Sequence, residues 1–244
     1  MPDQRSHRGP HPEDEVLFAA DQWTGLRAAT ADLSWLLSRG YSMVSALKLV
    51  GDRYQLQQRQ RLAVMRSACA DDALRLRETR RLATEELGDT RLLLDGYNVL
   101  TSVEAALGGG VILHARDHCY RDMASMHGTY RKVAETIPAL QLIGNYIARC
   151  SNASCLWYLD SPVSNSGRLK TMILEVAAES GWDWQVELVH SPDAVLAQST
   201  EVIATADSVI LDHCQRWINL AREVISASIP NAFVVNLADN ATER

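Results

Sequence analysis

Three aspartates from residue 91 onward each stand directly after a short apolar run. They are Asp95, which follows Leu92-Leu93-Leu94, and Asp160 and Asp207 further along. A short apolar run bounded by turn-forming residues predicts a strand that is buried on both faces. Parallel strands end at the same edge of a sheet, where open α/β sheets bind their ligands. The sequence therefore predicts that these three carboxylates gather at one edge.

Carboxylates that lie close together cannot all ionise cheaply, because like charges raise one another's pKa. Either a shared proton or a bound divalent cation resolves that conflict, and at neutral pH the cation is favoured. Ligands that are all oxygen favour Mg²⁺ or Mn²⁺ over zinc. Such a metal activates water and neutralises a phosphodiester, which points to hydrolysis of nucleic acid. The alternative is that the acids only cap helices, as Asp207 would for the helix after it.

Two other enzyme classes lack their defining residues. A haloacid-dehalogenase phosphatase needs a second aspartate two residues after the first, where this chain has Tyr97. A dinucleotide-binding fold needs G-x-G-x-x-G after its first strand. The segment Asp95-Gly96-Tyr97-Asn98 does not supply it.

The strand-end motifs resemble those of the PIN/NYN nuclease superfamily: Asp95-Gly96-Tyr97-Asn98-Val99, Leu159-Asp160-Ser161-Pro162 and Thr205-Ala206-Asp207-Ser208. The whole chain also resembles an uncharacterised prokaryotic two-domain family, in which a helical domain precedes a PIN-like domain. The resemblance implies a PIN-like doubly wound, mainly parallel α/β sheet and a metal-dependent ribonuclease that hydrolyses RNA. Because PIN-like domains commonly pair, it also allows a homodimer. The alternative is a PIN-like module that binds RNA or a protein partner without cutting it.

Further acids surround the predicted metal core of Asp95, Asp160 and Asp207. Asp122 and Glu104 compete for a fourth position, and Asp212 is an outer candidate. The case for Asp122 rests on the family motif around Arg121-Asp122-Met123 and His127-Gly128-Thr129-Tyr130-Arg131.

Polar and basic residues near the acids would position substrate. Asn98 would hold a ligand or water, and the hydroxyls of three residues would orient phosphate or carboxylates: Ser161, Thr205 and Ser208. Arg131, from the family motif, and Arg168 would contact phosphate. Arg168 stands at the start of a predicted helix, where free backbone amides favour anions.

The composition indicates a globular protein of 244 residues with a net charge of −6. No apolar run approaches the ~20 residues that span a bilayer, and the first residues lack the apolar core of a signal peptide. A cytoplasmic location follows, with a disordered tail at 1–12. The five cysteines form no CxxC pair and are expected to be reduced, buried fillers. His114 and His118, spaced as on a helix, leave zinc as an alternative.

Residues 13–88 are predicted to form helices only, in a separate domain. The first helix ends near Arg39-Gly40, a second spans 42–50 with Ser42 as cap and Gly51 as stop, and a third spans 54–87 with a break near 70–72. Gly88-Asp89-Thr90 would be the hinge to the α/β domain, 91–240.

The third helical segment is rich in arginine. Between residues 53 and 81 stand eight arginines against three acids. Arginine offers paired donors to phosphate, so this segment is the candidate contact for the RNA backbone, through Arg53, Arg59, Arg61 and Arg66. The alternative is a solvated helix face or a protein-contact surface.

In the α/β part, strands at 111–113, 155–159, 184–189, 201–206 and 233–237 alternate with helices at 99–107, 138–150 and from 168. That alternation predicts one parallel doubly wound sheet.

Overall fold

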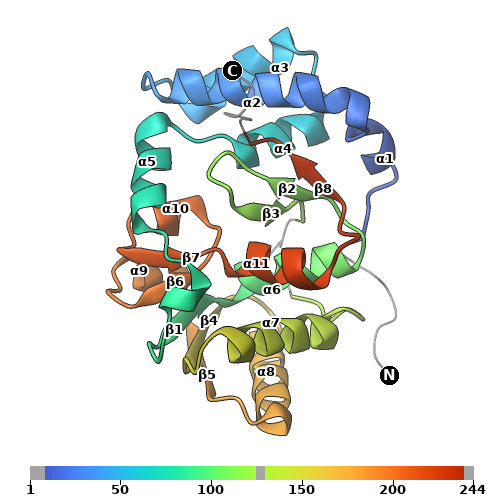
Figure 1. Ribbon diagram of the computed structural model, residues 1–244. Helices are drawn as coiled ribbons and strands as arrows, with labels where there is room; N and C mark the ends of the chain where they lie inside the picture. Colours follow the sequence, from blue (N-terminus) through green and yellow to red (C-terminus); the bar gives the residue numbers. More distant parts are fainter. Residues whose placement is uncertain (1–8, 125–129, 239–244) are drawn as a thin grey trace.

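The computed structural model describes residues 9–124 and 130–238, and its centre is a five-stranded parallel sheet (Figure 1). The strand order is β5-β4-β1-β6-β7. The strands are β1 (Leu92–Asp95), β4 (Cys155–Asp160), β5 (Trp184–Val189), β6 (Val202–Ala204) and β7 (Arg216–Ile218). The parallel α/β sheet is therefore confirmed, although β7 was not predicted.

Strand β1 is buried on both faces because it lies in the middle of the sheet. Leu92 and Leu94 pack on one side, against α6 (Gly96–Leu107), α7 (Thr136–Cys150), α8 (Ser166–Ser180) and α11 (Leu220–Ser228). Leu93 packs on the other side, against α9 (Pro192–Ala197) and α10 (Ser208–Leu211). This alternation is the period of two that a strand imposes, and it explains the continuous leucine run.

The last predicted strand, at 233–237, belongs to a second sheet and not to the central one. Its order is β3-β2-β8, with β3 (Tyr120–Asp122) antiparallel and β8 (Val234–Asn236) parallel to β2 (Ile112–His114). The prediction that 233–237 joins a single doubly wound sheet was therefore wrong. Strand β3, which was not predicted, has only partly buried residues and so carries no apolar signature.

The first part of the described chain is helical, as predicted. Its elements are α1 (Asp14–Leu17), the 3₁₀ turn η1 (Ala20–Gln22), α2 (Trp23–Leu37), α3 (Met43–Arg53), α4 (Gln58–Ser67), α5 (Asp71–Arg80) and the 3₁₀ turn η2 (Thr84–Glu86). Gly40 has φ +80° just after α2, and the Ser42 hydroxyl accepts a hydrogen bond from the Ser45 amide to cap α3. Gly51 lies inside α3 rather than after it, because α3 continues to Arg53.

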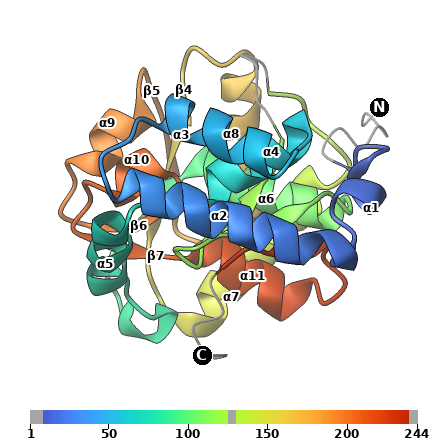
Figure 2. The same ribbon diagram turned by 90° about the horizontal axis from the view of Figure 1, so that it is seen from above.

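The helical segment shares its core with the second sheet. Leu33 and Val64 belong to the same apolar cluster as Leu113 of β2 and Val235 of β8. Helix α2 lies across this sheet, and α5 runs from the helical layer towards β7 and α10 (Figures 1 and 2). The helical segment 13–88 thus buries apolar side chains against residues of the second part.

Within residues 9–124 and 130–238, no helix has both the length and the apolar character that crossing a membrane requires.

Candidate active site

A pocket of about 810 Å³ opens at the carboxyl ends of β1 and β6. From β1 the chain adds β4 and β5 on one side, and then returns to place β6 and β7 on the other. Such a reversal of strand order leaves a crevice where α/β sheets bind ligands. The pocket is lined by acids from three of these connections: Asp95, Asp193 and Asp207.

Asp95 is the most deeply buried of the three, with 8% of its surface exposed. Its carboxylate accepts a hydrogen bond of 2.8 Å from the Thr205 hydroxyl. Burial raises the pKa of Asp95 to about 7, and the charges of Asp207 and Asp193 add to the rise. The carboxyl group thus titrates near neutral pH.

Asp207 is held at the amino terminus of α10. Its Oδ1 accepts hydrogen bonds from the amides of Val209 at 2.7 Å and Ile210 at 3.3 Å. The cap role that the sequence left as an alternative is therefore present. Because the residue also lines the pocket, capping does not exclude binding.

Thr205 and Asn98 fix the loop between β6 and α10. The Thr205 hydroxyl, while donating to Asp95, accepts a 3.0 Å hydrogen bond from the Asp207 amide. The Asn98 side-chain oxygen accepts a 2.8 Å hydrogen bond from the amide of Ala206. Asn98 lies at the pocket, so its positioning role acts on the loop that carries Asp207.

Asp193 belongs to the site but was not among the predicted residues. It lies in the first turn of α9, after a cap at Ser191 and Pro192. Burial and the charge of Asp207 raise the pKa of Asp193. The signal in the sequence is an acid shortly after the strand at 184–189, separated from it by His190, Ser191 and Pro192.

Asp160 ends β4 as predicted, but it does not line the pocket. Burial and the charge of Asp193 raise the pKa of Asp160, so it is coupled to the acids of the pocket through Asp193. Ser161, the next residue, is exposed and outside the pocket lining. The edge thus carries four coupled acids, of which three face the pocket.

Asp122 reaches the same pocket from β3. Its carboxylate accepts hydrogen bonds from the hydroxyls of Ser102 at 3.0 Å and Thr101 at 3.3 Å, and from the Ala124 amide at 2.8 Å. The guanidinium of Arg66 lies 3.9 Å from it. Asp122 is therefore brought to the site, but in a hydrogen-bonded and partly neutralised state.

Glu104 is not brought to the site. It is fully buried in α6 and accepts hydrogen bonds of 2.6 Å from the hydroxyls of Tyr130 and Thr136. These bonds tie α6 to α7 and the segment before it. The structure gives Glu104 a structural role, so the competition for the fourth position favours Asp122.

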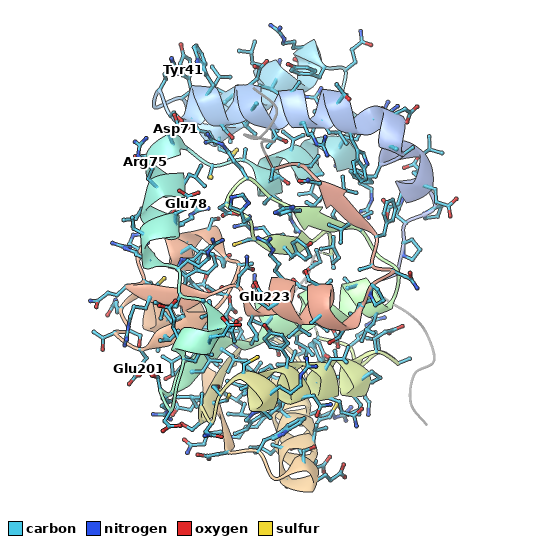
Figure 3. The ribbon with its side chains drawn as sticks, in the orientation of Figure 1. Tyr41, Asp71, Arg75, Glu78, Glu201 and Glu223 are labelled. Atoms are coloured by element: carbon cyan, nitrogen blue, oxygen red, sulfur yellow. The ribbon has the colours of Figure 1, made fainter. Side chains whose placement is uncertain are left out.

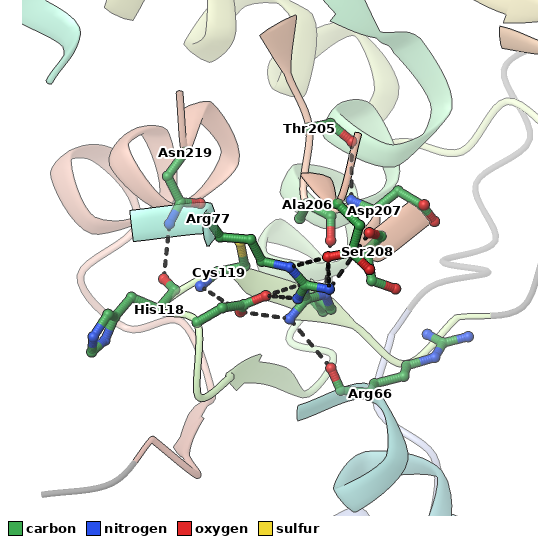
Figure 4. A network of polar contacts seen from close by, with 12 residues as sticks. Arg66, Arg77, His118, Cys119, Thr205, Ala206, Asp207, Ser208 and Asn219 are labelled. Carbon is green, nitrogen blue, oxygen red and sulfur yellow. Dashed lines mark hydrogen bonds and ion pairs between the residues drawn. The ribbon is translucent and has the colours of Figure 1, made fainter. Parts of the chain in front are cut away.

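A second polar network lies beside the pocket and includes Arg77 (Figure 4). It is centred on Asp117. The Asp117 carboxylate is 2.6 Å from the guanidinium of Arg77 and 2.6 Å from that of Arg121. Arg77 also pairs with Asp212 at 2.7 Å, and Arg121 donates to the Ala206 carbonyl at 2.8 Å. Asp212 and Ser208 line the pocket, and the Asp212 carboxylate is paired with Arg77.

The predicted RNA-binding arginines do not form one free surface. Arg59 pairs with both oxygens of buried Asp14, Arg61 with Asp52 at 2.8 Å, and Arg53 with Asp32 at 3.6 Å. Of the four, Arg66 alone lines the pocket. Three of these arginines form intramolecular ion pairs, because the fold brings acids from other parts of the sequence next to their helices.

Other predicted contacts lie away from the pocket. Arg131 and Arg168 are exposed and do not line it, and the motif residues His127, Gly128 and Thr129 lie outside the described residues. On α5, Asp71, Arg75 and Glu78 lie on the exposed side of the helix (Figure 3), whereas Arg77 turns inward to its acids.

The zinc alternative rested on a helix that the structure does not form, although the rings of His114 and His118 have centroids 5.7 Å apart. His114 ends β2, and His118 lies in a turn with φ +63°, so the two do not share a helix. All five cysteines are free thiols, and four are buried as expected. Within the described residues, no three acid, histidine or cysteine side chains lie close enough to form a ready-made metal site.

The pocket acids nevertheless have the donor chemistry of a hard cation. Asp95, Asp193 and Asp207 offer only oxygen, which Mg²⁺ and Mn²⁺ accept. Mg²⁺ commonly keeps several waters and uses one or two carboxylates, so a preformed cage of three is not required. A cation there would be held by Asp95 and Asp207, and it would relieve the repulsion that raises the pKa of Asp95.

The chain is similar to families and a relative that carry no described activity. Residues 25–80 match the model described as Protein of unknown function (DUF434), and residues 84–223 match Domain of unknown function (DUF5616). The division between the two falls beside the predicted hinge. No solved structure matches the chain.

A relative from Methanocaldococcus jannaschii, the uncharacterized protein MJ0935, is 31% identical over 202 residues. The match covers 82% of this chain and 96% of the relative, so both the helical segment and the α/β part are shared. The chain belongs to the family described as Domain of unknown function (DUF5616).

Proposed function

We propose that this protein is a metal-dependent ribonuclease with a PIN-like α/β fold, in which Mg²⁺ or Mn²⁺ and RNA meet at the pocket. The observation that carries the proposal is the opposition of charges in one cavity. Asp95, Asp193 and Asp207 lie on the sheet side, and Arg66 lies on the helical side. A cytoplasmic location, which the sequence predicts, is part of the proposal.

The acids supply what a phosphodiester hydrolase needs to hold a cation. The buried carboxyl of Asp95 titrates with a pKa of about 7 and is oriented by Thr205. Asp207 is held in place by its bonds to α10. A bound Mg²⁺ or Mn²⁺ would lower the pKa of a water and polarise the phosphate.

Arg66 supplies the contact for the phosphate. Its side chain is 26% exposed, and its guanidinium donates to the backbone carbonyls of Asp122 and Ala124. Carbonyls are neutral partners, and the nearest carboxylate, that of Asp122, lies 3.9 Å away, so the guanidinium charge is only partly compensated. Arg66 can therefore stabilise negative charge at the centre of the pocket.

The test is cleavage of labelled single-stranded and structured RNA with Mn²⁺ or Mg²⁺. We expect the wild type to cut RNA and Asp207→Asn to lose at least about 100-fold in rate, as removal of charge stabilisation does elsewhere. Asparagine keeps the oxygen that caps α10, so the fold should survive. Asp89→Asn, an exposed acid in a turn, is the matched control and should cut normally.

RNA that binds but stays intact with several divalent ions would contradict the proposal. The protein would then be a PIN-like binding module, the alternative that the resemblance left open. Cleavage by Asp207→Asn at the wild-type rate would instead show that another site, or a contaminant, cuts the RNA.

A further inference from the structure

Besides its acids, the pocket has an apolar wall that the proposed chemistry does not use. The helical segment contributes this wall from residues at or near the ends of its helices. Its members are Leu37, Met43, Met65, Ala68, Ala70 and Ala73. Each is partly buried rather than fully covered, so apolar surface at this wall is in contact with water.

Such a wall favours a ligand that has an apolar face. Sites for small molecules are concave, largely apolar, and contain a few placed polar groups. The two methionines are flexible and polarisable, so they can adapt to a flat ring. The wall itself contains no aromatic side chain, although Tyr97 of α6 also lines the pocket, so the wall would accept different rings without selecting one.

The arginine side of the pocket favours a ligand that also carries an anionic group. Three arginines line the pocket, but Arg77 and Arg121 each have a carboxylate oxygen within 2.6 Å. Arg66 has its nearest carboxylate at 3.9 Å. Met65 and Arg66 are neighbours in the chain, so the apolar wall adjoins the least neutralised of the three guanidinium groups.

We infer that the pocket binds a nucleotide unit, with its phosphate at Arg66 and its base on the wall around Met43 and Met65. An apolar ring joined to a phosphate satisfies both halves of the cavity, which neither an inorganic anion nor a simple apolar compound does. The inference rests on the proposed function and deepens it, because it makes the helical segment the contact for the base. A base in a duplex has both faces stacked, so the nucleotide must be unpaired.

Calorimetric titration with AMP and with ribose 5-phosphate, each with Mg²⁺ present, tests the inference. The two probes share the phosphate and the sugar and differ in the base. We expect the wild type to bind AMP at least about tenfold more tightly than ribose 5-phosphate, a difference of about 1.4 kcal/mol. Met65→Gln should remove most of that preference and leave ribose 5-phosphate binding unchanged.

Two further variants separate the halves of the pocket. Arg66→Gln should weaken both probes equally, because both carry the phosphate. Leu49→Gln replaces an apolar residue of α3 that is 60% exposed outside the pocket lining and should change neither. If Met65→Gln does not fold, Met43→Gln tests the same wall.

Equal affinity of the wild type for the two probes, absence of AMP binding, or an unchanged preference in the methionine variants would overturn the inference. AMP has no phosphodiester bond, so this outcome is independent of RNA cleavage. A protein that prefers AMP but never cuts RNA would lose the proposed activity and keep the site. If the protein cuts RNA without preferring AMP, the proposed activity stands and only the inference of base binding at the wall is refuted.

Discussion

Two aspartates near the pocket are both buried, but their pKa values are shifted in opposite directions. Asp95 is 8% exposed and Asp117 is 2% exposed. Burial alone would raise the pKa of both carboxyl groups. Asp95 also faces other acids, and its pKa reaches about 7. Asp117 lies between Arg77 and Arg121, whose charges and hydrogen bonds hold its pKa well below the ordinary value.

The difference teaches that the partner, not the depth of burial, decides whether a buried acid is neutralised within the fold. Asp117 is already neutralised and joins α5 to the turn between β2 and β3. Asp95 has a hydrogen bond from Thr205 but repulsion from Asp193 and Asp207. Its charge is uncompensated in the described structure, which is the state that a cation would relieve.

The largest effect is expected from Asp117→Asn. Removing this charge leaves buried Arg77 and Arg121 without their shared acid, although Arg77 keeps Asp212. Breaking a buried ion pair on one side costs about 3–5 kcal/mol. Urea unfolding at pH 8 should show a loss of that size, and a loss below about 1 kcal/mol would contradict the structural role.

Asp95→Asn should instead increase the free energy of unfolding at pH 8 without metal. The folded protein holds the Asp95 proton up to a pKa of about 7, whereas the ordinary value is 3.8. The folded state thus binds the proton more tightly, and stability falls as pH rises from about 4 to about 7. The variant avoids this penalty, so it should be more stable than wild type by up to roughly 4 kcal/mol at pH 8.

The same comparison made at several pH values sharpens this prediction. Below about pH 3.8 position 95 is neutral in both forms, folded and unfolded, so the difference between their unfolding free energies should no longer change with pH. The difference between the unfolding free energies of Asp95→Asn and wild type should grow between about pH 4 and pH 7 and stay constant above pH 7. A constant gap at all pH values, or a less stable variant at pH 8, would contradict a raised pKa.

A smaller effect is expected from the helical arginines, and it also depends on the partner. Arg59 pairs with Asp14, which has no exposed surface, so Arg59→Ala should cost about 3 kcal/mol. Arg61 pairs with exposed Asp52, so Arg61→Ala should cost far less than Arg59→Ala. Equal losses in urea unfolding would show that burial of the acid does not matter here.

The sequence predicted most elements of the main sheet and the edge at which Asp95 and Asp207 meet. Apolar runs such as Leu92–Leu94 carry a local signature, because each residue must be buried. The second sheet could not be foreseen, since β3 has no fully buried residue and β8 pairs with β2, from which it is remote in sequence.

The partners of charged groups were also beyond the sequence. The arginines of α4 and α5 look like a free basic surface until the fold brings acids onto them: Asp14 to Arg59 and Asp117 to Arg77. Charge counts along a chain record which groups exist, but pairs across 40 or more positions depend on the tertiary structure.

Thermal unfolding with and without Mn²⁺ at pH 8, in wild type and in Asp95→Asn, tests most directly whether the coupled acids form a cation site. A ligand at about 100 times its Kd adds about 2.7 kcal/mol to the stability of the folded state. For a chain of this size that raises the Tm by roughly 5 °C or more. We predict this rise for wild type and for the control Asp89→Asn, and its loss in Asp95→Asn. Equal stabilisation of wild type and Asp95→Asn by Mn²⁺ would contradict the account.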